Sequence, residues 1–234
     1  MLTIIVPVFN EKKYIVKIIK KLINLKKIKS QLIIVDDGSN DGTTKILREN
    51  FSKNKKINKI IFHGINKGKG SAIRSAQKYI KGDYVAIQDA DLEYNPNDLV
   101  RLYKYIKKNN LKVLYGSRVL EKNKFQNTEN FTHLIRIWAN YFLTIVSNFI
   151  NNQELTDAHT CYKVFNSNLF KKIYLSENGF AFCPEITTKI SNLNINIFEI
   201  PISYNGRTYD EGKKISSIDG LRALYSLIKY KFVS

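Results

Sequence analysis

Short apolar runs alternate with longer segments of helical periodicity over the first half of the chain. Each run is nearly continuous in aliphatic and β-branched residues, which is typical of parallel strands covered on both faces. The predicted strands span Leu2 to Val6, Gln31 to Val35, Ile57 to Phe62, Tyr84 to Gln88 and Val113 to Tyr115. The predicted helices between them span about residues 11–25, 42–50, 70–80 and 96–108. This alternation predicts an α/β fold with a doubly wound, mostly parallel sheet.

The pattern changes after Arg118. A polar stretch at 121–129 leads into a long amphipathic segment, Phe131 to Ile150, and a polar loop follows it. Further on, the sequence predicts a strand at Cys161 to Phe165, helices near 167–174 and 184–192, a strand at Ile195 to Ile202 and a helix from Ser217 to about Phe232. Because no repeat or low-complexity linker separates the halves, we expect one compact domain over 1–234, with halves at about 1–118 and 119–234.

The composition is that of an ordinary globular domain. The 234 residues are 44% hydrophobic, 12% aromatic and 25% charged, with only 11 Gly and 4 Pro, which excludes disordered, collagen-like and low-complexity proteins. The two cysteines, Cys161 and Cys183, form no CxxC pair and no Cys/His cluster. They therefore predict neither a disulfide framework nor a zinc site, and they favour a reducing compartment.

The net charge is strongly positive, with 38 Lys and Arg against 20 Asp and Glu, or +18 at pH 7. An anionic partner is consistent with this charge, but the sequence has no recognition helix, RNP-type strand or zinc knuckle, so we expect no nucleic acid. The N-terminal apolar run follows no basic segment and is interpreted as a strand, not a signal peptide. The most membrane-like stretch, Leu134 to Ile150, contains Arg136 and is shorter than the roughly 20 residues that span a bilayer, so we expect no transmembrane helix.

Acidic residues follow the predicted strands where each strand ends. Glu11 comes after the first, Asp36 and Asp37 directly after the second, and Asp89 and Asp91 after the fourth. In open α/β sheets this edge binds ligands, and clustered carboxylates repel unless a cation lies among them. Asp89 and Asp91 are spaced to hold Mg²⁺ or Mn²⁺, which bridges to substrate phosphates. A solvated turn is the alternative for this pair, and turn capping is the alternative for Asp37.

The segment NKGKGS, Asn66 to Ser71, opens the third predicted helix. Glycines allow the backbone to approach a phosphate, and a helix N-terminus favours an anion. The segment matches neither the Walker loop nor GxGxxG. A phosphate contact and a plain helix start therefore both stay open.

Eight segments occur in a characteristic order along the chain. They are TIIVPVFNE, IIVDDGSNDGT, NKGKGSAIRSA, GDYVAIQDADLEYNP, YGSR, TDAHTCYKVF, GFAFCPEI and IPISYNGRTYDEGKKI. Together they resemble family 2 glycosyltransferases with the GT-A fold, and among these the polyprenyl-phosphate (dolichyl-phosphate) mannose or glucose synthases. The resemblance runs from about residue 3 to residue 230. It implies a single GT-A domain whose first half binds a nucleotide sugar and whose second half binds the acceptor.

The resemblance also implies a donor site at the strand ends. Nucleotide-sugar binding is implied for Pro7, Phe9, Glu11, Asp36, Asp37, Asp89 and Asp91. Asp89 and Asp91 would also hold the Mg²⁺ or Mn²⁺ ion. Glu93 would be a third metal ligand, at a position where relatives often have Gln.

On the acceptor side, the resemblance implies catalytic roles for Asp91, Arg118 and Asp157. The cations implied to face the acceptor phosphate are Arg118, Arg136, Arg207, Lys213 and Lys214. An exposed helix face is the alternative for Arg136. Asp157 and Glu185 match acidic positions whose roles vary among family members.

The residues themselves favour a phosphate acceptor over a hydroxyl. A phosphate monoester has its second pKa near about 6, so at neutral pH it attacks an anomeric carbon without a strong general base. It needs cations to hold it, and Arg offers phosphate planar, bidentate donors. This chemistry agrees with what the resemblance implies, which is an inverting, metal-dependent transfer of mannose or glucose from a GDP- or UDP-sugar to polyprenyl phosphate.

The segment from Leu134 to Ile150 carries an apolar stripe that includes Trp138 and Phe142. Core packing is the usual reason for such a stripe, and an interfacial helix that reaches a lipid-linked phosphate is the alternative. Many relatives continue into transmembrane helices after the final helix. This chain ends there, so we expect peripheral attachment to the cytoplasmic face of a membrane, directly or through an anchoring partner subunit.

Two other functions stay open at this stage. A transferase of the same fold with a hydroxyl acceptor would need a base, and Asp157 and Glu185 are its candidates. A non-catalytic subunit that binds sugar nucleotides would recruit partners through its basic surface. The sequence does not decide between GDP and UDP or between the sugars.

Overall fold

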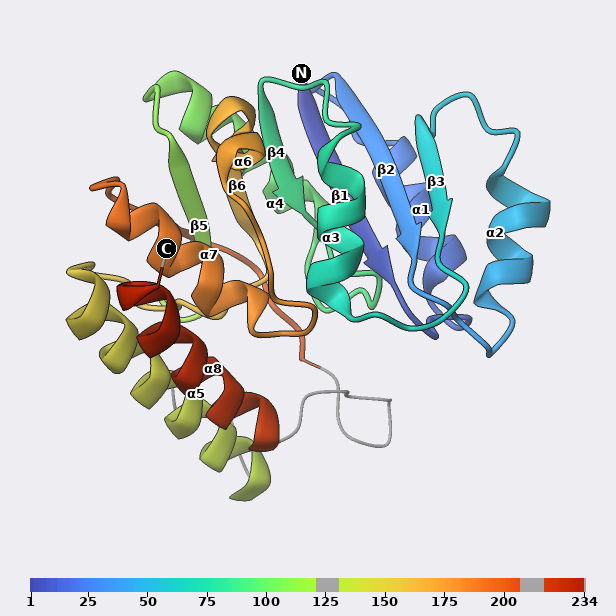
Figure 1. Ribbon diagram of the computed structural model, residues 1–234. Coiled ribbons are helices and arrows are strands. Elements are labelled where there is room, and N and C mark those ends of the chain that lie inside the picture. Colours follow the sequence, from blue (N-terminus) through green and yellow to red (C-terminus); the bar gives the residue numbers. More distant parts are fainter. Residues whose placement is uncertain (121–130, 207–216, 234) are drawn as a thin grey trace.

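The fold is centred on one β-sheet. The computed structural model describes residues 1–120, 131–206 and 217–233, with side chains described except at 131–136 and 217–218. Within these ranges seven strands form the sheet, in the order β3-β2-β1-β4-β6-β5-β7 (Figure 1). The strands are β1 (Leu2–Val8), β2 (Ser30–Asp36), β3 (Lys59–Phe62), β4 (Tyr84–Ile87), β5 (Val113–Ser117), β6 (Lys163–Asn166) and β7 (Phe198–Pro201).

Most neighbouring strands run parallel. β1 pairs with β2 and β4, β2 with β3, and β5 with β7, whereas β6 is antiparallel to both β4 and β5. The predicted α/β fold with a mostly parallel sheet is thus confirmed. The last two strands are displaced or shorter than predicted at 161–165 and 195–202, and the antiparallel direction of β6 was not predicted. An apolar run predicts a strand, but its direction depends on the long connection through the second half.

The carboxyl ends of β1, β2 and β4 lie at the same edge of the sheet, the lower edge in Figure 1. The register pairs Val8 with Asp36 and Ile5 with Ile87. The segments that follow these three strands are therefore neighbours. This edge is where open α/β sheets bind ligands.

Helices cover both faces of the sheet, with α3 (Lys69–Gln77) in front of β1 and β2 in Figure 1 and α1 (Ile15–Ile23) and α4 (Pro96–Lys108) behind. The other helices are α2 (Thr43–Phe51), α5 (Phe131–Asn151), α6 (Ser167–Lys172), α7 (Phe182–Asn192) and α8 (Ser217–Phe232). α1 begins later than predicted because Tyr14 and Ile15 donate their N–H groups to the carbonyl of Glu11, which closes a turn first. The apolar residues of β1, β2 and β4 are almost fully buried between the layers.

α5 lies beside α8, beyond the sheet (Figure 1), and presents its apolar stripe outward. Trp138, Phe142 and Phe149 are 56%, 58% and 90% exposed, while the buried positions include the polar residues Thr144 and Ser147. The core-packing interpretation is therefore wrong for these aromatic residues. Periodicity finds the stripe but cannot tell which side of a helix meets the domain.

α8 also carries exposed apolar residues, although apolar residues are buried on it as well. Leu221, Tyr225 and Phe232 are exposed, whereas Leu227 and Tyr230 are buried. We call the exposed apolar side chains the outer face of α5 and α8: Trp138, Tyr141, Phe142, Ile145, Phe149, Leu221, Tyr225, Ile228 and Phe232. Among the described helices, none combines the length and the hydropathy that a membrane span requires.

Candidate active site

Asp36, at the end of β2, closes its own turn. Its carboxylate accepts hydrogen bonds from the N–H and Oγ of Ser39 and from Oγ1 of Thr44, and Asp36 is 1% exposed. These contacts occupy both oxygens. A direct contact between Asp36 and a nucleotide stays a prediction.

Asp37 fastens the loop that precedes α3. Its Oδ1 lies 2.6 Å from Nδ1 of His63 and accepts the N–H of Lys67, and its Oδ2 accepts the N–H of Gly68 at 2.6 Å. Gly68 has φ +95°, and a Cβ there would overlap the carbonyl of Asn178, so this position requires glycine. Turn capping was the alternative for Asp37, but the structure places its contacts across the sheet edge instead.

The start of α3 is bound by protein groups. The N–H of Ser71 donates to the carbonyl of Asn178, and Arg74 binds the carbonyls of Leu175 and Glu177 and Oδ1 of Asn178. Because Gly68 N–H and Ser71 N–H already have protein acceptors, the helix-start interpretation of NKGKGS fits these two groups better than a phosphate contact does.

Asp89 follows β4 and forms an ion pair with Lys69, the first residue of α3. Lys69 Nζ lies 2.5 Å from Oδ1 of Asp89, and the two side chains are only 14% and 22% exposed. Burial alone would lower the pKa of Lys69, but the charge of Asp89 outweighs it and raises the pKa well above its usual value. Lys69 Nζ also lies 3.6 Å from Sγ of Cys161. The ammonium thus stands at a carboxylate that the sequence assigns to a metal ion.

Asp91 and Glu93 lie in the same turn and have different surroundings. Oδ1 of Asp91 accepts the N–H of Glu93, and Oε2 of Glu93 accepts the hydroxyl of Tyr204 at 2.7 Å. The described residues contain no group of three or more His, Cys, Asp or Glu side chains arranged to hold a metal. Two carboxylates still suit Mg²⁺ or Mn²⁺, because such ions take hard oxygen ligands and complete their shell with water and substrate phosphates. The metal roles of Asp89, Asp91 and Glu93 stay predictions.

Pro7, Phe9 and Glu11 lie at or just after the end of β1, as the motif implied. Pro7 and Phe9 are partly exposed, and Glu11 is 6% exposed with its N–H donated to Oγ1 of Thr43. The three residues therefore border the same edge as Asp37 and Asp89. Their contacts with a nucleotide sugar are not tested by the structure.

Arg118 and Asp157, both implied as catalytic, form a clamp. Nε and Nη2 of Arg118 donate to Oδ2 and Oδ1 of Asp157 at 2.6 and 2.7 Å, and the Arg118 N–H donates to Oδ2 as well. The guanidinium lies 5.1 Å from the ring centroid of Tyr204. Asp157 is completely buried, which by itself would raise its pKa, but Arg118 holds that pKa far below its usual range. The Nε and Nη2 edge of Arg118 thus binds the Asp157 carboxylate, whereas Nη1 has no hydrogen-bond partner among the described residues.

A fully buried lysine, Lys163, supports the loop that carries Asp157. Its Nζ donates to the carbonyls of Ala158 and Thr160 at 2.9 and 2.7 Å and lies 4.0 Å from the ring centroid of Tyr115. Burial lowers the pKa of Lys163. Burial, aided by Lys163, also lowers the pKa of His159 to about 4, so this imidazole is neutral at pH 7.

Glu185, in the first turn of α7, is also completely buried and paired. Its Oε1 accepts the N–H and Oγ of Ser176 and Nζ of Lys189, and its Oε2 accepts the N–H of Glu177. Tyr230 of α8 reaches the same loop through Ser176 and Glu177. Glu185 therefore holds the 176–178 loop, whose other side packs on α3.

Four of the predicted phosphate-binding cations fall outside the described part of the structure. Arg136 belongs to α5, but its side chain is not among those described, and Arg207, Lys213 and Lys214 lie in the undescribed range 207–216. Their roles stay predictions.

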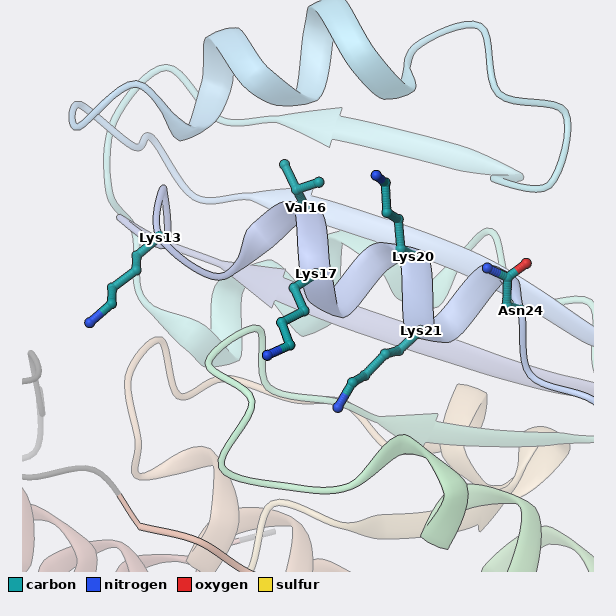
Figure 2. Close-up of a pocket in the computed structure, with 6 residues that line it drawn as sticks. All are labelled: Lys13, Val16, Lys17, Lys20, Lys21 and Asn24. Carbon is teal, nitrogen blue, oxygen red and sulfur yellow. The ribbon is translucent and has the colours of Figure 1, made fainter.

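A shallow hollow of about 570 Å³ lies over α1, away from these residues. Figure 2 shows its lining, in which Lys17, Lys20 and Lys21 extend from α1. The lining residues are Lys13, Val16, Lys17, Lys20, Lys21 and Asn24. Its lining contains no acidic side chain. It is a basic surface, not a catalytic centre.

Sequence reasoning missed three polar residues around the site. Lys69 and Tyr204 stand inside motifs quoted for the resemblance, and Lys163 lies in the TDAHTCYKVF segment. No local pattern pairs Lys69 with Asp89 or Tyr204 with Glu93, because these contacts join segments that are distant in sequence. A lysine in an otherwise apolar run, as at Lys163, was the one signal available.

Comparison with known proteins places this geometry in a family. The family model described as glycosyl transferase family 2 matches residues 3–174. The chain is 32% identical to dolichyl-phosphate beta-glucosyltransferase of Saccharomyces cerevisiae, over 97% of this chain and 73% of that protein. It is 27% identical to the UDP-N-acetylglucosamine–dolichyl-phosphate N-acetylglucosaminyltransferase of Methanococcus voltae, over 99% of this chain and 96% of that protein.

Solved structures share the fold at low sequence identity. Glucosyl-3-phosphoglycerate synthase from Mycobacterium tuberculosis, in a complex with Mn²⁺, UDP and phosphoglyceric acid, superposes with a TM-score of 0.71 at 12% identity, covering 100% of this chain and 79% of that one. Mannosyl-3-phosphoglycerate synthase from Rubrobacter xylanophilus gives 0.69 at 16% identity, covering 98% and 72%. The sheet, the ordered motifs and the family match together show that the chain belongs to glycosyl transferase family 2 and has the GT-A fold expected from its sequence.

Proposed function

We propose that this chain is an inverting glycosyltransferase that moves a hexose from a nucleoside-diphosphate sugar to a polyprenyl phosphate at the cytoplasmic face of a membrane. The two relatives named above are described as acting on dolichyl phosphate, and they match nearly the whole chain. We favour a UDP-sugar donor, because one relative is named for UDP-N-acetylglucosamine and the M. tuberculosis structure contains UDP. The relatives are named for glucose and N-acetylglucosamine, and mannose stays an alternative.

The observation that carries the proposal is the state of the two buried carboxylates in the second half. A hydroxyl acceptor needs a base to take its proton. Asp157 has both oxygens bound by Arg118 and a pKa far below its usual range, and Glu185 is buried with both oxygens hydrogen-bonded. Both carboxylates are thus already engaged by protein groups. A phosphate acceptor needs no such base, since it is ionised at neutral pH.

The arrangement of Arg118 supports an anionic acceptor. Asp157 holds the guanidinium in a fixed plane, and its own buried oxygens are used up in doing so. The edge of the Arg118 guanidinium that does not contact Asp157 is therefore already oriented. Binding a phosphate oxygen there costs less side-chain entropy, which strengthens the contact. In this proposal Arg118 binds the acceptor phosphate and Asp157 is a positioning residue.

Asp89 and Asp91 supply the donor side of the proposal. Both carboxylates follow β4 at the binding edge of the sheet and suit a divalent ion. A bound Mg²⁺ or Mn²⁺ would neutralise the charge that develops on the departing nucleoside diphosphate. The two carboxylates follow a buried strand, which holds the backbone that carries them in place before the donor binds.

The outer face of α5 and α8 supports a membrane-bound acceptor. α5 turns aromatic residues outward and polar residues inward, which is unfavourable for a helix that meets water alone. Arg222, Lys229 and Lys231 lie on α8, and basic residues beside an apolar face are typical of helices that lie on anionic leaflets. We propose that this face rests on the bilayer that holds the acceptor lipid.

A transfer assay tests the proposed function. Purified protein would be incubated with Mn²⁺, a radiolabelled donor (UDP-glucose, UDP-N-acetylglucosamine or GDP-mannose) and either a short-chain polyprenyl phosphate or phosphoglyceric acid. We expect label in the organic phase with one donor. Label only in the water-soluble product, or none with any donor that binds, would overturn the lipid-phosphate proposal.

A further inference from the structure

The ion pair between Lys69 and Asp89 joins two segments of the donor edge. Lys69 Nζ is 2.5 Å from Oδ1 of Asp89, and both side chains are largely buried. Nζ of Lys69 also lies 3.6 Å from Sγ of Cys161. Asp89 is thus the anion that balances this ammonium within the described residues.

The backbone that carries Lys69 cannot follow the ammonium. Gly68 N–H is held by Asp37, Ser71 N–H is held by the carbonyl of Asn178, and a Cβ at Gly70 would overlap the carbonyl of Glu177. The loop and the start of α3 are therefore packed on both sides. The ammonium stands at the end of a flexible four-carbon chain, so it can leave Asp89 only by rotation of the Lys69 side chain.

A divalent cation and the Lys69 ammonium compete for the same carboxylate. A divalent cation bound at Asp89 and the Lys69 ammonium would together carry three positive charges, against the two negative charges of Asp89 and Asp91. Because the site is partly buried, the cation and the ammonium would repel each other strongly at short range. The ammonium needs another anion before the cation is accommodated. The diphosphate of the donor is the anion that reaches this edge, and it supplies oxygen ligands to both cations.

We propose that Lys69 is a counter-ion of Asp89 that the donor diphosphate displaces, so that the enzyme binds its divalent cation tightly only together with the nucleotide. In the absence of nucleotide, Lys69 occupies Asp89 and weakens cation binding. When the diphosphate binds, the ammonium moves onto a phosphate oxygen and Asp89 becomes a cation ligand. Lys69 thereby couples the binding of the cation to the binding of the nucleotide. The diphosphate takes the ammonium away from Asp89, and the cation offsets the negative charge that the diphosphate brings to Asp89 and Asp91.

This inference rests on the proposed function, which supplies the cation and the diphosphate, and its test needs no transfer. Mn²⁺ binding is measured by the EPR signal of free Mn²⁺, with and without saturating UDP, for wild type, Lys69→Met and Lys69→Arg. Lys78→Met is the matched control, because Lys78 is exposed just beyond the other end of α3. UDP binding without metal is measured on the same proteins by calorimetry, and thermal unfolding checks that each variant is folded.

For wild type, we expect UDP to tighten Mn²⁺ binding at least about tenfold. In Lys69→Met, we expect Mn²⁺ alone to bind about tenfold more tightly, the UDP effect to fall below about threefold, and UDP alone to bind more weakly. Lys69→Arg and Lys78→Met should keep the coupling. Unchanged or weaker Mn²⁺ binding by folded Lys69→Met would overturn the role of Lys69 and leave the proposed function intact. Failure of wild type to bind Mn²⁺ even with saturating UDP or GDP would overturn both.

Discussion

The two halves of the molecule distribute polar and apolar side chains in opposite ways. In the first half, α1 buries Ile15 and Ile18 and exposes Lys17, as a helix of a water-soluble domain does. In the second half, α5 buries Thr144 and exposes Trp138. The helix of the first half therefore presents polar side chains to its surroundings, whereas the helix of the second half presents apolar ones.

Asp89 of the first half also differs from the acidic residues buried in the second half. Asp89, in the first half, is partly exposed and paired with a single lysine side chain, that of Lys69, which we propose an incoming diphosphate displaces. Asp157 and Glu185, in the second half, are completely buried and fixed by several hydrogen bonds each. The difference indicates that Asp89 is accessible to a ligand, whereas Asp157 and Glu185, like the buried Asp36 and Asp37 of the first half, hold cations and loops in place.

The largest effect expected from this comparison follows removal of a donor-side carboxylate. Asp91→Ala should lower kcat/KM for transfer by about 10³-fold or more, because a group that stabilises the departing diphosphate is lost, while the melting temperature stays near that of wild type. Steady-state kinetics and thermal unfolding measure the two quantities. Glu49→Ala, at an exposed position of α2, is the control, and near-normal turnover in Asp91→Ala would refute the donor-side assignment.

Breaking the buried clamp should affect stability as well as transfer. Arg118→Ala leaves Asp157 buried without its cation, which costs about 3–5 kcal/mol in such cases, and we expect transfer to fall about 10²-fold or more. Arg118→Lys should recover part of the stability but little of the transfer, since lysine lacks the planar, bidentate donors. Urea unfolding and kinetics distinguish these outcomes. Full transfer by Arg118→Lys would show that the guanidinium geometry is unimportant.

Changes on the outer face should affect membrane binding and leave the rest of the enzyme alone. Replacing both Trp138 and Phe142 by Ala removes two large exposed side chains, and we expect binding to anionic vesicles to weaken by at least about tenfold. Transfer to a short, detergent-dispersed acceptor should change less than about threefold. Tyr105→Ala, an exposed aromatic residue on α4, is the control. Vesicle sedimentation that is equal for both variants would contradict the proposed face.

The smallest effect near neutral pH is a pH dependence of stability. The pKa of Asp157 is far lower in the folded protein than in the unfolded chain, where it is about 3.9. Its ionised form therefore stabilises the fold fully above about pH 5, and this contribution is lost as the pH falls below that value. The free energy of unfolding, measured with urea at pH 7 and pH 3.5, should fall less for Asp157→Asn than for wild type. A parallel fall would exclude Asp157 as a source of the acid sensitivity.

Much of the fold followed from local sequence, because continuous apolar runs and helical periodicity are local properties. β1, β2 and β4 were found this way, and the motifs placed Asp89 and Asp91 correctly at the end of β4. The contacts of these residues were not predictable. Lys69 meets Asp89 only because α3 and β4 are brought together in the fold, and no spacing in the sequence encodes that.

The outer face of α5 and α8 also could not be predicted from local sequence. The stripe at Trp138 and Phe142 was visible in the sequence, but an apolar stripe looks the same whether it faces a core or a membrane. What decides is the opposite side of the helix, where Thr144 and Asn148 make hydrogen bonds with the 155–158 segment. Those partners lie on a loop that follows the helix, and only the fold brings them beneath it.

In the proposed reaction a phosphate, not a hydroxyl, attacks the sugar. The most direct test compares a polyprenyl phosphate with the polyprenol of the same chain length as acceptors for wild type, at saturating donor and Mn²⁺. The two lipids differ only in the phosphate that Arg118 is proposed to bind, and label in the organic phase reports both reactions. We predict transfer to the polyprenyl phosphate and at least about 10³-fold less to the polyprenol. Comparable labelling of the two lipids would contradict a phosphate acceptor.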